Sequence, residues 1–98
     1  MTRERWKRIE KYNDYEVSTH GRVRSFRKRS EPKVLKVGYA PSDVLIVSLC
    51  NSAGKKTQQV RQLVLAAFMG PRPEHARIIH RDGDATNCKL YNLEYSID

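Results

Sequence analysis

Residues 78–95, IIHRDGDATNCKLYNLEY, place a histidine at the end of one β-prone run and an asparagine beside the next. RIIH predicts a strand, RDGD predicts a turn in which Gly83 supplies a positive φ, and YNLEY predicts a second strand. His80 would end the first strand and Asn92 would open the second, with a loop between them that folds back. The pattern therefore predicts a β-hairpin over 77–95 with an imidazole at its tip.

A histidine in this place has two interpretations. It can be a structural residue beside a turn, or it can act as the general base of a nuclease, taking a proton from water. Hydrolysis of a phosphodiester also needs an oxygen ligand that holds a divalent metal and basic groups that hold the strand. An amide such as Asn92 can bond the imidazole or the loop backbone and fix its orientation. The residues alone leave both interpretations open.

The sequence before the hairpin predicts short antiparallel strands followed by one helix. The strand-like runs are YEVS at 15–18, RVRSF at 22–26, VLKVGY at 34–39, VLIVSLC at 44–50 and KKTQQV at 55–60, with turns at THG and NSAG between some of them. In 60–69 the apolar residues follow helical spacing, and Gly70 and Pro71 end the pattern. The predicted fold class is α+β, with a small antiparallel N-terminal sheet, an amphipathic helix and the hairpin.

Aromatic and basic residues characterise the first third of the chain. Trp6, Ile9, Tyr12 and Tyr15 recur every three residues, which fits packing over the small sheet or, alternatively, a stacking platform for bases. Arg22 and Arg24 would share the exposed face of one strand, an arrangement that suits phosphate contacts and also solvated edge-strand charges.

Positive charge is concentrated in the same region. The net charge is +8, and residues 1–36 hold 12 Lys or Arg against 5 Asp or Glu, whereas residues 37–98 hold 7 against 6. A basic half beside a near-neutral half indicates a polyanion as partner, although a solvated basic surface would have the same composition. We therefore expect residues 1–36 to form a basic, DNA-contacting module and 37–98 to form a second part of one compact unit.

Three blocks resemble the phage-type HNH endonucleases of the homing-endonuclease kind. The hairpin carries H-x-D-G-D-x-x-N-x-x-x-x-N-L-E-Y, the run VRQLVLAAFMGPRPE resembles the helix and loop before that motif, and residues 6–25 resemble the nuclease-associated modular domain found ahead of it. The blocks occur in the family's order and span nearly the whole chain. The resemblance implies metal-dependent hydrolysis of DNA.

The family's site residues can be matched to positions here. His80 matches the general base and Asn92 the central asparagine that orients it. Asp82 and Asp84 match the turn, where they would cap backbone amides or, if the loop folds inward, ligate Mg²⁺ or a similar ion. The residues expected to bind double-stranded DNA are Arg22, Arg24, Arg27, Lys28, Arg29, Lys55, Lys56 and Arg81.

The sequence also departs from the family at several positions. Ile79 stands where active members commonly carry an acidic residue, and Arg61 replaces the histidine of a V-H-R-L-V pattern. Ser96-Ile97-Asp98 ends the chain where the motif's final helix would begin, so that helix is expected to be truncated. Three hypotheses follow: an active nuclease, a relative that binds DNA or a host or phage protein without cleaving, and a split enzyme completed by another chain.

Cysteine usage and hydropathy complete the expectations. Cys50 and Cys88 are too few for a four-cysteine zinc knuckle, so no structural zinc is expected and both thiols should be reduced. The longest apolar runs are too short to span a bilayer, and Met1 leads into a charged stretch rather than a signal peptide. We expect a cytoplasmic protein, in the host cytoplasm if it is phage-encoded, with no membrane partner.

Overall fold

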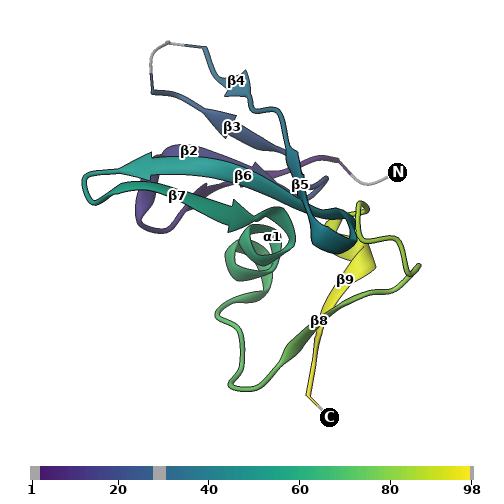
Figure 1. The fold of residues 1–98 in the computed structure, drawn as a ribbon. Coiled ribbons are helices and arrows are strands. Elements are labelled where there is room, and N and C mark those ends of the chain that lie inside the picture. Colours follow the sequence, from purple (N-terminus) through teal and green to yellow (C-terminus); the bar gives the residue numbers. More distant parts are fainter. Residues whose placement is uncertain (1–2, 28–30, 98) are drawn as a thin grey trace.

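A computed structural model describes residues 3–27 and 31–97, which form three antiparallel sheets around one α-helix (Figure 1). The strand order is β1-β2-β3-β4 in the first sheet, β5-β6-β7 in the second and β8-β9 in the third. The strands are β1 (Trp6–Ile9), β2 (Tyr12–Ser18), β3 (Val23–Ser25), β4 (Lys33–Val34), β5 (Gly38–Ala40), β6 (Val44–Asn51), β7 (Gly54–Gln59), β8 (Arg77–His80) and β9 (Leu93–Ser96). The predicted α+β class is confirmed.

Helix α1 (Val60–Met69) occupies the range that its apolar spacing predicted. Its buried residues Val60, Leu63 and Val64 form one stripe, and Leu65 is buried beside it. The helix contacts β1 and β2 of the first sheet, β6 and β7 of the second and β9 of the third. Gly70 ends the helix at φ 91°, a conformation that favours glycine. None of the helices among residues 3–27 and 31–97 is long and apolar enough to cross a membrane.

A single core joins the two parts into which the sequence was divided. Alternation along β6 buries Leu45, Val47 and Leu49, and these residues cluster with Tyr15 and Val17 of β2. The same cluster contains the buried residues of α1 and reaches Leu93 in the hairpin. The boundary at residue 36 stays a prediction, because the buried residues of both parts pack together.

Several elements differ from the sequence prediction: β1 was not expected as a strand, and β2 begins at Tyr12 rather than at residue 15. The expected strand over 34–39 is divided between β4 and β5, which belong to different sheets. The Leu35 amide still donates to the Val23 carbonyl at 2.8 Å, so the chain leaves the first sheet only after this bond. In the hairpin, Asn92 ends a 3₁₀ turn (Leu90–Asn92) and β9 begins one residue later. Propensity does not distinguish a strand from a turn whose shape is fixed by side-chain bonds.

The turn between β2 and β3 fastens the first sheet to the hairpin loop. The Leu90 amide donates to the Thr19 carbonyl at 2.8 Å. Gly21 lies against Cys88 so closely that an added Cβ would be 2.8 Å from the Cys88 carbonyl oxygen and 2.9 Å from its Cβ. Since Gly21 also has φ +81°, this contact requires glycine on both conformational and steric grounds. The first sheet therefore helps to position the loop that carries His80.

Replacing Gly21 with alanine should destabilise the protein more than the same change at Gly83. Gly83 has a similar φ, +76°, but nothing lies within 4 Å of an added Cβ, so the two variants share the conformational strain and differ in the steric clash. We expect an additional loss of about 1–3 kcal/mol for Gly21→Ala, the usual cost of overpacking. Urea unfolding of both variants measures the difference, and equal stabilities would contradict the close contact with Cys88.

Candidate active site and nucleic-acid interface

His80 lies at the end of β8, as the sequence predicted, and is half-buried. It pairs with Leu93 in the β8–β9 register. Its Nδ1 atom lies 3.2 Å from the Asn87 carbonyl oxygen. A carbonyl oxygen only accepts, so Nδ1 carries the proton and the neutral ring presents its lone pair at Nε2. This is the tautomer that a base acting through Nε2 requires.

Asn92 holds the loop rather than the imidazole. Its side chain is buried at 3% exposure, and the Nδ2 group donates to the Asp82 carboxylate at 3.0 Å and to the Asn87 carbonyl at 2.9 Å. Its Oδ1 atom accepts from the Asp82 amide at 3.0 Å. Asn92 and His80 therefore bond to the same Asn87 carbonyl, which makes Asn92 a positioning residue that acts through the backbone.

The two turn carboxylates accept hydrogen bonds within the loop. The Asn87 side chain, followed by the Asp84 amide and the Asn92 side chain, lowers the pKa of Asp82 below its usual value. The hydroxyl and amide of Thr86 lower the pKa of Asp84 in the same way. Capping of backbone amides by both aspartates, one of the roles expected from the sequence, is present in the structure.

A divalent metal ion prefers several oxygen ligands, and the hairpin does not supply them as a set. Among residues 3–27 and 31–97 no three His, Cys, Asp or Glu side chains gather in positions to hold an ion. Both oxygens of Asp82 already accept bonds from the protein. Asp82 and Asp84 stay predictions as ligands, and the described residues do not form a complete metal centre on their own.

Arg61 is the side chain that most directly contacts His80. It lies in the first turn of α1, with Nη1 at 3.4 Å from His80 Nε2 and Nε donating to the Gln59 side-chain oxygen at 3.0 Å. The sequence showed Arg61 as a departure from the family pattern but gave no indication of this contact, which depends on how α1 packs against the hairpin. Gln59 was not recognised from the sequence at all.

Burial makes Cys88 a packing residue of the loop. The thiol is 4% exposed, and desolvation raises its pKa to about 11, so it stays protonated near neutral pH. Both Cys50 and Cys88 are free thiols. Cys88 is therefore not available as a thiolate, either to ligate a metal ion or to act as the general base.

Arg22 and Arg24 lie on the same face of the first sheet, as predicted, but each is paired with a carboxylate. Arg22 binds Glu4 through two bonds of 2.9 and 2.5 Å, and Arg24 binds Glu16 through bonds of 2.9 and 2.6 Å. Both guanidinium groups also lie over the Trp6 ring, at 5.5 and 4.0 Å from its centre. Trp6 is thereby covered by arginine rather than open for a base.

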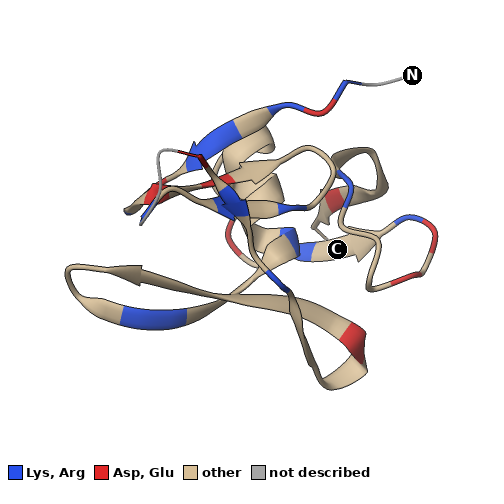
Figure 2. Ribbon diagram, turned by 90° about the horizontal axis from the view of Figure 1, so that it is seen from above, with Lys and Arg blue, Asp and Glu red and all other residues tan. Residues whose placement is uncertain are grey.

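The other predicted DNA contacts are distributed over several elements, and Figure 2 shows Asp and Glu residues interspersed with Lys and Arg. Arg27 lies 3.7 Å from Asp14, and Arg81 lies 3.7 Å from Glu94. Lys55 and Lys56 are exposed neighbours on β7, so their side chains point to opposite faces of the second sheet. Lys28 and Arg29 lie outside the described residues. These assignments stay predictions.

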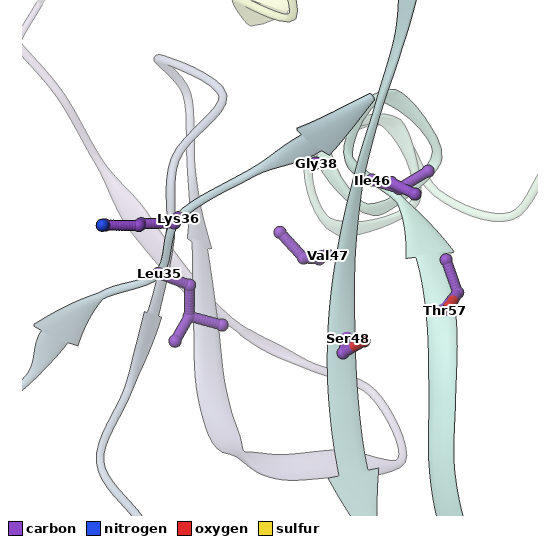
Figure 3. A pocket seen from close by; sticks show the side chains of 7 residues that line it. All are labelled: Leu35, Lys36, Gly38, Ile46, Val47, Ser48 and Thr57. Carbon is purple, nitrogen blue, oxygen red and sulfur yellow. The ribbon is translucent and has the colours of Figure 1, made fainter. Parts of the chain in front are cut away.

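A hollow of about 270 Å³ lies on the second sheet (Figure 3), and His80 is not among the residues that line it. It is lined mainly by Leu35, Gly38, Ile46, Val47 and Thr57, with the Lys36 side chain directed away from it. The lining offers few polar groups for a nucleotide. This hollow is therefore separate from the candidate site at the hairpin tip, where His80 is half-buried.

The geometry defines a two-stranded hairpin that carries a histidine at its tip, has its loop held by Asn92 and contacts a basic N-terminal sheet. Comparisons with known proteins indicate that this arrangement is similar to that of HNH endonucleases. Residues 4–50 match the NUMOD4 motif. The chain is 29% identical over 93 residues to an uncharacterized HNH endonuclease of Acanthamoeba polyphaga mimivirus, covering 94% of this chain and 27% of that protein.

A solved structure extends the agreement to three dimensions. The chain superimposes on the HNH homing endonuclease I-HmuI, described for DNA binding and cleavage, with a TM-score of 0.83 and 30% identity over 94% of this chain and 52% of that one. The resemblance expected from the sequence is confirmed: the chain is similar to HNH homing endonucleases in both sequence and fold. It spans about half of I-HmuI and about a quarter of the viral relative.

Replacing Asn92 with alanine should loosen the loop and lower stability by about 1–3 kcal/mol, because the Asp82 amide and the Asn87 carbonyl lose a buried partner. Asn51→Ala is a matched control, since Asn51 also bridges a carbonyl and an amide but does so at an exposed turn. Urea unfolding and amide exchange at Asp82 report the effect. An Asp82 amide as protected in Asn92→Ala as in the wild type would contradict the network.

Replacing Glu4 with glutamine should make stability less sensitive to acid. The hydrogen bond from Arg22 lowers the pKa of Glu4 from 4.5 to about 2, against a smaller opposing effect of burial. Because the pKa of Glu4 is lower in the folded protein than in the unfolded chain, its ionised form stabilises the fold above pH 4.5. This stabilisation is lost as the pH falls toward 2. Unfolding midpoints measured across this window should decline less steeply in Glu4→Gln than in the wild type. Parallel profiles would show that the Arg22 ion pair contributes nothing measurable.

Proposed function

We propose that this chain binds double-stranded DNA and hydrolyses a phosphodiester bond, with His80 as the general base and a divalent ion such as Mg²⁺ as cofactor. One observation carries the proposal: the bond of Nδ1 to the Asn87 carbonyl leaves Nε2 as the basic atom at the hairpin tip. The similarity to I-HmuI and to the viral HNH endonuclease supports the same reaction class.

The residues around His80 would hold and move one proton. Nε2 takes the proton from a water molecule, while the Asn87 carbonyl stabilises the positive charge that develops on the ring. Asn92 keeps that carbonyl in place through its own bond of 2.9 Å. The metal ion would stabilise charge on the phosphate, and since the described residues offer no complete ligand set, phosphate oxygens and water are expected among its ligands.

A second candidate function is binding without cleavage, in which the chain binds DNA, or a host or phage protein, and hydrolyses no phosphodiester bond. Two observations favour it. Ile79, where an acidic residue is common in the family, is 37% exposed and offers no ligand. Arg61 lies at hydrogen-bonding distance from the atom that would act as base. In either case the proposal includes action in the cytoplasm of a host cell, as expected for a phage-encoded protein.

Incubation of supercoiled plasmid with the protein and Mg²⁺ or Mn²⁺ tests the reaction. The wild type should nick the plasmid, and His80→Ala should lower the rate by about 100-fold or more, because general bases typically contribute that factor. His75→Asn is the matched control, since His75 is exposed at 86% of its side chain and asparagine tolerates its φ of 66°. Its nicking rate should equal that of the wild type.

Measurement of DNA affinity at several salt concentrations separates the two candidate functions. If roughly five phosphates are neutralised, the logarithm of the affinity should fall with the logarithm of salt concentration at a slope of about −4 to −5. Binding of this kind without nicking would favour the second candidate. Nicking that persists in His80→Ala would contradict the assigned base, and an interaction independent of salt would contradict DNA as the partner.

A further inference from the structure

Arg61 differs from the other arginines near the proposed DNA surface in having neutral partners. Arg22, Arg24, Arg27 and Arg81 each lie within 4.0 Å of a carboxylate. Arg61 has no such partner in the described part of the chain, and its side chain contacts the Gln59 amide oxygen and His80 Nε2. Arg61 therefore forms no ion pair with a described carboxylate at the place where the proposed reaction occurs.

The guanidinium group also retains free donors. Arginine has five N–H groups, and the two contacts engage one on Nε and one on Nη1. Both N–H groups of Nη2 remain available, and release of Nη1 from His80 would complete the planar pair of donors that matches two oxygens of a phosphate. A phosphate carries a negative charge and can accept two parallel N–H bonds from a guanidinium, so it attracts Arg61 more strongly than the uncharged imidazole, which accepts one.

The contact with Nε2 has a consequence for the base. The Asn87 carbonyl fixes the proton on Nδ1, so Nε2 can only accept, and Arg61 Nη1 is the donor across the 3.4 Å separation. While this bond lasts, the lone pair that would take a proton from water is occupied. A ligand that withdraws Arg61 would free it.

We propose that Arg61 is a phosphate-binding residue that covers His80 Nε2 in the free protein and transfers to a backbone phosphate when DNA binds. This inference rests on the proposed DNA-binding function and assigns a position to one phosphate, beside His80. Because a guanidinium–phosphate contact carries no base identity, the contribution of Arg61 is independent of DNA sequence. DNA binding then exposes the base only where a phosphate is already in place.

Fluorescence anisotropy with a labelled duplex, without metal, tests the binding step. Arg61→Gln should flatten the salt slope by about 1, the value for one lost phosphate contact, and lower the affinity about tenfold near 0.1 M salt. Arg61→Lys should keep the slope of the wild type because it keeps the charge. Arg77→Gln is the matched control, because Arg77 is an exposed residue of the same strand as His80 and points to the opposite face.

Nitrogen NMR of the His80 ring tests the transfer in the unmodified protein, whether or not the variants fold. Saturation with duplex should shift the Nε2 resonance and leave Nδ1, which stays bonded to Asn87, nearly unchanged. An unshifted Nε2 resonance would overturn the proposal, as would equal salt slopes for Arg61→Gln, Arg77→Gln and the wild type. If the wild type itself fails to bind the duplex, the proposed function fails instead, so the two failures are distinguishable.

Discussion

The carbonyl oxygen of Asn87 is the atom on which the candidate site depends. It accepts from His80 Nδ1 and from Asn92 Nδ2, at 3.2 and 2.9 Å, and thus determines both the tautomer and the orientation of the imidazole. The carbonyl has this position because Asn92 is buried and its amide bonds tie the loop to the turn at Asp82. A histidine on a free hairpin tip would sample several orientations, and this one is limited by a buried amide that it does not touch.

The N-terminal sheet contributes to the site through direct contact with the hairpin loop as well as through its charge. The turn at Thr19 and Gly21 contacts the loop at Cys88 and Leu90, so the part of the chain with the highest basic charge is fixed relative to His80. Within that sheet, however, arginine charge is largely compensated by Glu4 and Glu16, with Trp6 between the guanidinium groups. The 19 Lys and Arg residues therefore overstate the number of cations that are free to replace counterions on DNA, because acidic residues such as Glu4 and Glu16 already pair with some of them.

Much of the fold was predictable because its signals are local. Helix α1 follows from apolar spacing and Gly70, and the His80 strand tip follows from RIIH before Asp-Gly. The split of the 34–39 run between two sheets was not predictable, since it depends on which strand each half pairs with. The same limit applies to the site: the sequence indicated His80 and Asn92, but the Asn92 bond to a backbone carbonyl and the Arg61 contact arise from tertiary packing.

The phosphate contact proposed for Arg61 rests on its lack of an ion-pair partner among the described residues rather than on its exposure. Arg22 has 51% of its side chain exposed and Arg81 has 56%, yet binding a phosphate there must compete with an existing carboxylate. At Arg61 the competitors are an amide oxygen and a neutral ring nitrogen, which are weaker acceptors than a phosphate. A half-buried arginine with neutral partners is thus better prepared for an anion than the more exposed arginines, and in this protein it lies beside the proposed base.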